Sequence, residues 1–103
     1  MIERHVTFDV LPGKEKDFET FFSREYAPAM SRQAGFLGVS LLREADAPTA
    51  HKMVIAFETS DQAAAWRASD LHKALSPRLK SMYSESRVTV YEVVVRTKQA
   101  RLR

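Results

Sequence analysis

Cysteine is absent from this chain of 103 residues, which also contains only three Gly and four Pro. Without cysteine the chain has no disulfide bond, no thiolate metal ligand and no cysteine nucleophile. The low Gly and Pro content argues against a loop-rich or low-complexity protein. Hydrophobic residues make up 45% of the sequence and charged residues 28%. This composition predicts one folded domain with a modest core.

Long hydrophobic runs are also missing. Residues 1–5 contain no apolar stretch of the kind found in a signal peptide. The longest apolar runs, such as residues 53–57 and 93–95, are far shorter than the ~20 residues of a membrane-spanning helix. We therefore expect a cytoplasmic protein that does not enter the membrane, and the absence of cysteine fits a reducing compartment.

The last eight residues contain no acidic side chain, although they hold four of the 16 basic ones. Without those four, 12 basic residues remain against 13 acidic ones, so the net charge of +3 originates at the C-terminus. The sequence predicts a domain over residues 1–95 followed by a basic tail over residues 96–103. A nucleic-acid-binding face is not indicated, because such a face would spread basic residues over the folded body.

The first half of the chain predicts a strand followed by a helix. Residues 5–10 alternate polar and apolar side chains, as in a half-buried strand. From Lys14 onward, aromatic residues recur at steps of three and four, which predicts a helix with one apolar face. Pro28 should kink or restart this helix, and Gly35 should end it as a left-handed cap.

The second half predicts two more strands, a second helical region and a last strand. Residues 36–43 and 51–58 form a predicted hairpin across a polar loop at residues 44–50. Thr59-Ser60-Asp61 and Ser69-Asp70 are helix-start signals, and Pro77 should break or bend the helix that it interrupts. Residues 87–95 are rich in β-branched side chains. The β-α-β-β-α-β order predicts a ferredoxin-like plait, an α+β fold with four antiparallel strands and helices on one face.

Both faces of the predicted sheet carry apolar side chains. In the last strand, one side would hold Val88, Val90 and Val94, and the other Tyr91, Val93 and Val95. Because helices cover only one face of a plait, a sheet that is apolar on both faces needs a second cover. We expect a second copy of the chain, packed sheet to sheet as a two-fold homodimer. The alternative is that these valines are ordinary exposed residues.

Trp66 and His72 are the most distinctive candidates for chemistry. They lie six residues apart across the predicted break at Ser69, so both side chains can point into the space between helices and sheet. Trp66 offers an apolar wall and one N–H donor, and His72 can accept a proton near neutral pH. Trp66 is alternatively a core residue, and His72 a solvated helix residue.

Other candidates carry weaker signals. The aromatic run that contains Phe22 and Tyr26 is either plain core or the lining of an aromatic pocket, and Tyr83 can donate to a substrate oxygen. We therefore take Phe22, Tyr26 and Tyr83 as candidate substrate-binding residues. The three histidines show no helical metal-binding spacing, so no metal site is predicted.

Four segments share their order and spacing with a known family: Phe8-x-Val10-x-Pro12-Gly13-Lys14-x-x-x-Phe18, Gly35-Phe36-Leu37-Gly38, Phe57-Glu58-Thr59 and Trp66-x-x-Ser69-x-x-His72. From about residue 3 to about residue 95 the chain resembles the antibiotic biosynthesis monooxygenase domain of the dimeric α+β barrel superfamily. The resemblance implies a homodimer in which two sheets form a barrel. It also implies a pocket between sheet and helices in each subunit.

The resemblance further implies a reaction. Some members oxidise aromatic phenols or anthrones to quinones with O₂, without metal or flavin. The substrate is deprotonated to an electron-rich anion that reacts with O₂ directly. By this resemblance Trp66 is the pocket wall and donor, His72 is the available proton acceptor, and no cofactor is needed. The partners would be O₂ and a small hydrophobic, aromatic or enolisable substrate.

Two alternatives remain. Family members that degrade heme use an Asn on the first strand, the Trp, and a His ten residues after the Trp. Those positions are Val6, Trp66 and Ser76 here, so only the Trp is retained and heme degradation is disfavoured. The other alternative is a non-catalytic dimeric domain that binds a small hydrophobic ligand.

Overall fold

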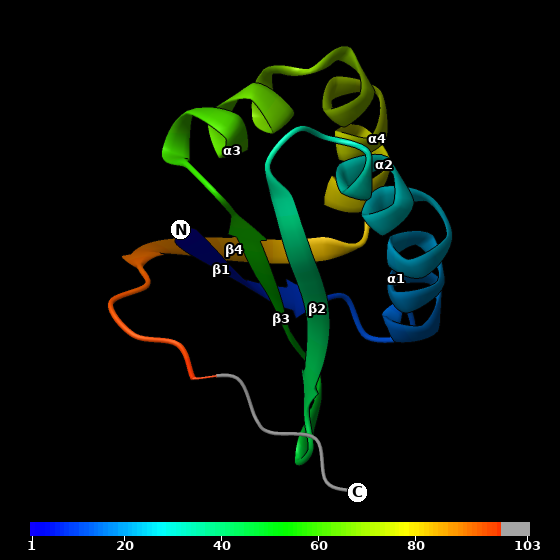
Figure 1. Cartoon of the computed structure of the whole chain (residues 1–103). Helices are drawn as coiled ribbons and strands as arrows, with labels where there is room; N and C mark the ends of the chain where they lie inside the picture. The colour runs from blue at the N-terminus through cyan, green and yellow to red at the C-terminus, as the bar shows by residue number, and fades with distance from the viewer. Residues whose placement is uncertain (98–103) are drawn as a thin grey trace, which may run out of the picture.

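A computed structural model describes residues 1–97 (Figure 1), so most of the predicted basic tail lies outside the described residues. The described chain forms one four-stranded sheet in the order β2-β3-β1-β4, with antiparallel pairing throughout. The predicted ferredoxin-like α+β fold is confirmed. Its elements in chain order are β1 Ile2–Val10, α1 Glu15–Phe21, the π-helical turn η1 Phe22–Tyr26, α2 Ala27–Ser31, β2 Phe36–Glu44, β3 Ala47–Phe57, α3 Ser60–Ala68, α4 Asp70–Lys80 and β4 Tyr83–Glu92.

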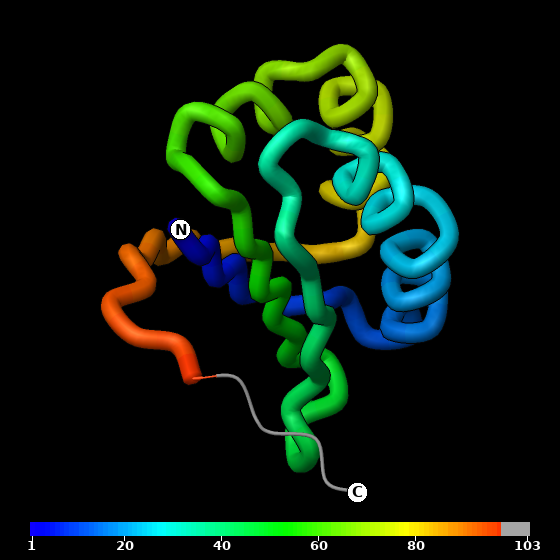
Figure 2. The backbone as a smooth tube through the Cα atoms, viewed as in Figure 1, coloured from blue at the N-terminus to red at the C-terminus, as the bar shows by residue number. Residues whose placement is uncertain are grey.

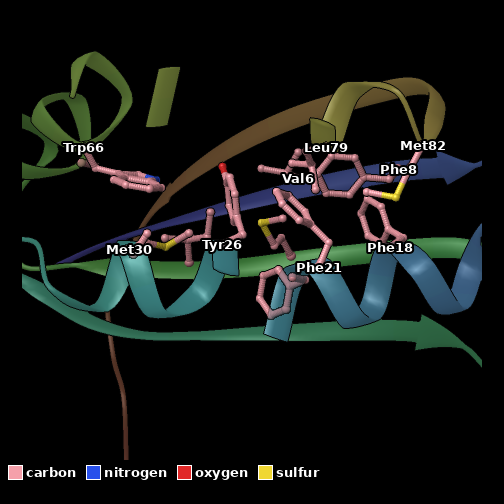
Figure 3. Packing of buried hydrophobic residues seen from close by; sticks show 14 of the residues in the cluster. Val6, Phe8, Phe18, Phe21, Tyr26, Met30, Trp66, Leu79 and Met82 are labelled. Atoms are coloured by element: carbon pink, nitrogen blue, oxygen red, sulfur yellow. The ribbon is translucent and has the colours of Figure 1, made fainter. Parts of the chain in front are cut away.

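The core lies between the helices and one face of the sheet (Figure 3). On β1 the inward positions follow the predicted alternation, and Val6, Phe8 and Val10 are buried there. Phe18 from α1 and Met53 and Phe57 from β3 are fully buried against them. Each such side chain contributes roughly 1.5–3 kcal/mol by leaving water, so this face dominates the stability of the fold. None of the helices among residues 1–97 is long and apolar enough to span a membrane.

The first helical region runs from Glu15 to Ser31 without a break. The predicted disturbance near Pro28 takes the form of η1, in which the Ala27 N–H bonds to the Phe22 carbonyl one residue further back than in an α-helix. Pro28 then lies in the first turn of α2, where its missing N–H costs least. The helix ends before Gly35, which instead takes a φ of 80° in the turn leading into β2.

Three predicted boundaries are wrong. The expected loop at residues 44–50 is a two-residue turn, because β3 already begins at Ala47. The β2–β3 register shifts between Arg43 and Glu44, and β1 pairs with β3 only as far as Ala50. Pro48 therefore lies at an irregular strand end, where its missing N–H is tolerated. Pro77 lies inside the continuous helix α4 and does not break it.

The last strand is the third error. It spans Tyr83–Glu92, so Val94 and Val95 lie beyond it. In the register of β1 and β4, Val88 pairs with Val6 and therefore faces the helix side, as does Val90. Both are nevertheless about half exposed, at 45% and 55%, because the helices leave this edge of the sheet partly open. The valines that suggested a second apolar face thus belong partly to the first face and partly to the segment after the strand.

The opposite face of the sheet mixes polar and apolar side chains. Tyr91 packs there against His5 with ring centroids 4.7 Å apart, and Glu3 accepts a hydrogen bond from Nε2 of His5 at 2.7 Å. The chain after β4 returns toward this face: the Val93 N–H donates to the Met1 carbonyl, and Arg96 pairs with Glu3. Figure 2 shows the N-terminus beside the end of β4. The domain boundary at residue 95 remains a prediction.

Candidate functional site

A cavity of about 200 Å³ lies where α3 and α4 meet the inner face of the sheet. Pockets for drug-sized ligands usually measure ~300–1,000 Å³, so this cavity suits a small molecule. Its walls are largely aromatic and aliphatic, and its polar groups come from β1, η1, α3, α4 and β4. The lining comprises Arg4, Val6, Phe8, Tyr26, Met53, Ile55, Phe57, Ala63, Trp66, Arg67, His72, Ser76, Leu79, Lys80, Tyr83, Ser86 and Val88.

Ser69 positions both predicted catalytic residues. It adopts an extended backbone between α3 and α4, and its Oγ accepts a hydrogen bond from the His72 backbone N–H at 3.1 Å. The same hydroxyl donates to the Trp66 carbonyl at 2.7 Å. The resulting break lets side chains six residues apart meet: the rings of Trp66 and His72 are 5.0 Å apart at 85°. The predicted pairing of these two residues through a helix break is present in the structure.

Tyr26 completes a cluster of three rings. It comes from η1, and its ring centroid lies 5.7 Å from that of Trp66 and 6.1 Å from that of His72. Figure 3 shows Tyr26 and Trp66 next to each other at one end of the core. Trp66 is only 2% exposed, so it both belongs to the core and lines the cavity.

The cavity favours a neutral imidazole and a neutral phenol. Partial burial lowers the pKa of His72, and the positive charges of Arg67, Lys80 and Arg4 lower it further. His72 is therefore unprotonated near neutral pH and able to accept a proton. Burial raises the pKa of Tyr26 to about 12, against the opposing effect of Arg4. The Tyr26 hydroxyl accordingly remains a hydrogen-bond donor.

The charged groups that line the cavity all have the same sign. Arg4, Arg67 and Lys80 reach it, and no Asp or Glu is among its lining residues. Burial lowers the pKa of the Arg4 guanidinium, and the neighbouring Arg67 adds to that effect. A region with several cations and no carboxylate stabilises an anion by its electrostatic potential. The site can thus bind a negatively charged small molecule or one that becomes an anion there.

The other predicted residues divide between two places. Tyr83 lines the same cavity and packs against Phe8, with ring centroids 4.9 Å apart. Phe22 does not line it; instead it borders a groove of about 730 Å³ between the first helical region and the β2–β3 hairpin. Arg4 also lines the cavity but was not among the predicted residues. It lies two positions before the buried Val6 on β1, so strand alternation places both side chains on the same face of the sheet.

A paired cluster of charges lies along the groove beside Phe22. The His51 side chain is 0% exposed, and its Nε2 hydrogen-bonds to the Glu19 carboxylate at 2.7 Å. Arg43 donates to both oxygens of the same carboxylate, at 2.8 and 3.1 Å. The hydrogen bond to His51 lowers the pKa of Glu19, and Arg43 lowers it further. Among residues 1–97, no three His, Asp or Glu side chains gather as a metal site would require.

The family of the chain follows from its sequence. The profile of the antibiotic biosynthesis monooxygenase family matches residues 1–78, and the chain belongs to this family. Among curated proteins, none matches the sequence significantly.

Solved structures share the fold closely. A protein from Bordetella bronchiseptica, assigned as an antibiotic biosynthesis monooxygenase, is 27% identical in sequence to this chain. The alignment covers 91% of this chain and 97% of that chain, with a TM-score of 0.82. One from Nitrosomonas europaea is 21% identical over 92% of this chain and 100% of that one, also at 0.82. SnoaB from Streptomyces nogalater, described as a cofactor-independent oxygenase, is 21% identical over 95% and 97% at a TM-score of 0.85.

Proposed function

We propose that the protein is a cofactor-independent monooxygenase that uses O₂ to oxidise a small aromatic or enolisable substrate. The observation that carries this proposal is the neutral His72 held beside Trp66 and Tyr26 in a cavity that is lined, within the described chain, by cations and by no carboxylate. Such a site can take a proton from a phenol or enol and stabilise the anion that remains. Membership of the monooxygenase family, and the likeness to SnoaB, support the same chemistry.

The proposed reaction begins with proton transfer to a ring nitrogen of His72. The resulting phenolate or enolate is electron-rich and reduces O₂ directly. For an anthrone-type substrate, the reacting CH₂ carbon becomes a carbonyl; one oxygen atom of O₂ enters the product, and the other leaves as water with the two hydrogens. The protein supplies the base, the orientation and the electrostatic stabilisation of the anion.

The remaining residues of the cavity bind and orient the substrate. The buried Trp66 provides a flat apolar wall and an indole N–H donor. The Tyr26 hydroxyl, with its pKa raised to about 12, donates to a substrate oxygen without losing its own proton. Tyr83 forms part of the opposite wall next to Phe8.

Oxygen uptake tests this proposal directly. Metal-free protein should consume O₂ only when a suitable phenol, quinol or anthrone is present, and uptake should collapse in Trp66→Phe and His72→Ala with the fold intact. His5→Ala is the matched control, because His5 lies on the opposite face of the sheet against Tyr91. Full activity of both cavity variants on a true substrate would refute the assignment of the site. A thermal shift on ligand addition without O₂ uptake would instead identify a binding protein.

The homodimer is a separate proposal. Support comes from the family resemblance and from the opposite face of the sheet, where Val54 and Tyr91 stand among polar side chains. Packing of this face against a second copy would complete the barrel. Light scattering at micromolar concentration should give twice the monomer mass, and a monomer mass would refute the proposal. The cytoplasmic location stays a prediction.

A further inference from the structure

Arg4 occupies an unusual position for a charged residue. It lies on β1, the strand between β3 and β4, and in the register of the sheet it pairs with Ile55 and Val90. Its even position on the strand turns the side chain toward the helices, in phase with Val6, and the residue is half-buried. The guanidinium therefore reaches the cavity from its floor, from a position between two apolar strand neighbours.

No carboxylate of the chain neutralises Arg4 within residues 1–97. The other arginines of the described chain are all exposed to water, and three of them also have a carboxylate partner: Arg43 with Glu19, Arg78 with Glu25 and Arg96 with Glu3. A charge that is partly removed from water without a partner is unfavourable for folding. Such a group is retained at a cost in stability when it has a ligand to bind.

The surroundings of Arg4 strengthen this argument. Arg67 and Lys80 are exposed at the rim of the same cavity, so the positive potential extends from the rim to the floor. The planar guanidinium presents parallel N–H donors whose spacing matches the two oxygens of a carboxylate. The aromatic side chains Trp66 and Tyr26 stand in the same cavity and can pack against a ring.

We propose that Arg4 binds a carboxylate of the substrate, so that the cavity selects small aromatic acids over their neutral analogues. The inference rests on the proposed function in one respect, the assignment of this cavity as the substrate site. Arg4 is then a specificity-determining residue: it holds the acid group at the floor of the sheet, while the ring lies against Trp66 and its hydroxyl faces the half of the cavity that contains His72.

Binding of a matched pair of probes tests the inference without any turnover. The pair is 4-hydroxybenzoate and 4-hydroxybenzamide, which share a ring and a hydroxyl and differ in charge; 6-hydroxy-2-naphthoate and its amide form a larger second pair. Affinity is measured by titration calorimetry. Fluorescence quenching marks the site, because Trp66 is the only tryptophan of the chain. The acid should bind about tenfold or more tightly than the amide, as expected for a charge-assisted hydrogen-bonded pair.

Three variants complete the design. Arg4→Gln should remove the preference for the acid, and Arg4→Lys should keep part of it, because the charge remains while the bidentate geometry is lost. Arg87→Gln is the control, since it changes the net charge equally but lies outside the cavity, on β4. The preference for the acid over the amide should persist in Arg87→Gln. Circular dichroism and thermal melting verify that each variant is folded.

The inference is overturned if the acids of both pairs bind no better than the amides, if neither acid perturbs Trp66, or if Arg4→Gln keeps the preference. Its failure is distinguishable from failure of the proposed function. Oxidation of neutral phenols with no effect of Arg4→Gln would refute the acid specificity alone. Arg4-dependent binding of the acids by a protein that consumes no O₂ with any phenol, quinol or anthrone, acidic or neutral, would refute the oxygenase and keep the specificity.

Discussion

The cavity beside Trp66 and the groove beside Glu19 both open between the helices and the sheet, but their charges are organised in opposite ways. In the groove, Glu19 is bonded to His51 and Arg43, so each charged group has its partner within the chain. In the cavity, Arg4 has no carboxylate partner within residues 1–97, and no acidic side chain lines the space. The charges of the groove therefore stabilise the fold, whereas the positive charges of the cavity are available to bind a ligand.

The histidine of the groove and the histidine of the cavity differ in the same way. The His51 side chain is fully buried, packs against the Phe18 ring at 5.3 Å and is hydrogen-bonded to Glu19. His72 is half-buried and touches aromatic rings, and its backbone N–H rather than its ring is engaged by Ser69. A side chain that is fully occupied by neighbours cannot also serve a substrate. His51 is therefore a structural residue, and His72 is the one free to act as a base.

Removing each imidazole in turn should separate the two roles by the largest effect. His51→Ala should lower the free energy of unfolding by about 3 kcal/mol, because it leaves a cavity beside Phe18 and an unbonded Glu19 oxygen. His72→Ala should cost about 1 kcal/mol or less, because its ring is half-exposed and makes no hydrogen bond to a partner within residues 1–97. Urea denaturation measures both. Equal losses would show that the two histidines do not have different roles.

The role of His72 as a base predicts how turnover depends on pH. Only unprotonated His72 accepts the substrate proton, so kcat/KM should be constant at higher pH and fall tenfold per pH unit below the pKa of His72. Since burial and the nearby cations lower that pKa from 6.5, the half-maximal point should lie below pH 6.5. Arg67→Gln removes one of the repelling charges and should shift the point upward. An unshifted or downward-shifted profile would contradict the role of His72.

Acid stability probes the groove. The folded-state pKa of Glu19 is lowered from 4.5, chiefly by the hydrogen bond to His51, so its carboxylate favours the folded state above pH 4.5. This contribution is lost as the pH falls through the lowered value. Because Glu19 is partly exposed, we expect it to amount to only about 1 kcal/mol. Glu19→Gln should therefore flatten the dependence of unfolding free energy on pH below 4.5, with Glu25→Gln as the control.

The smallest expected effect concerns the rim of the groove. Arg43 is more than half exposed where it meets Glu19, so Arg43→Gln should lower the free energy of unfolding by about 0.5 kcal/mol or less. Arg78→Gln, which breaks the exposed pair with Glu25, should have a similar effect. A loss above about 2 kcal/mol for Arg43→Gln alone would mean that the groove depends on this arginine as much as on His51.

The order of elements could be predicted because local signals carry it. Thr59 and Ser69 accept the backbone hydrogen bonds that start α3 and α4, as their positions in the sequence indicated. The end of the loop before β3 could not be predicted, since Pro48 is tolerated only through a register shift and the absence of a β1 partner. Strand pairing is non-local, and no spacing along the chain reveals it.

The site, like the order of elements, could be predicted only where local sequence determines it. Trp66 and His72 lie on either side of a local break, so their proximity follows from the sequence around Ser69. Arg4 was missed because a basic residue in an alternating strand looks like a solvent-facing position. Its phase with Val6 indicates otherwise, but only the sheet register shows which face is inward. The bond between Glu19 and His51 joins residues 32 positions apart and depends on the tertiary fold alone.

The Ser69 hydroxyl links the end of α3 to the start of α4. One oxygen atom is shared between the last turn of α3, where it donates to the Trp66 carbonyl, and the first turn of α4, where it accepts from the His72 N–H. The tryptophan and the histidine are therefore coupled at a joint that touches neither ring. A substitution that removes this oxygen breaks both hydrogen bonds at once, so the positions of Trp66 and His72 cannot be changed independently at this joint.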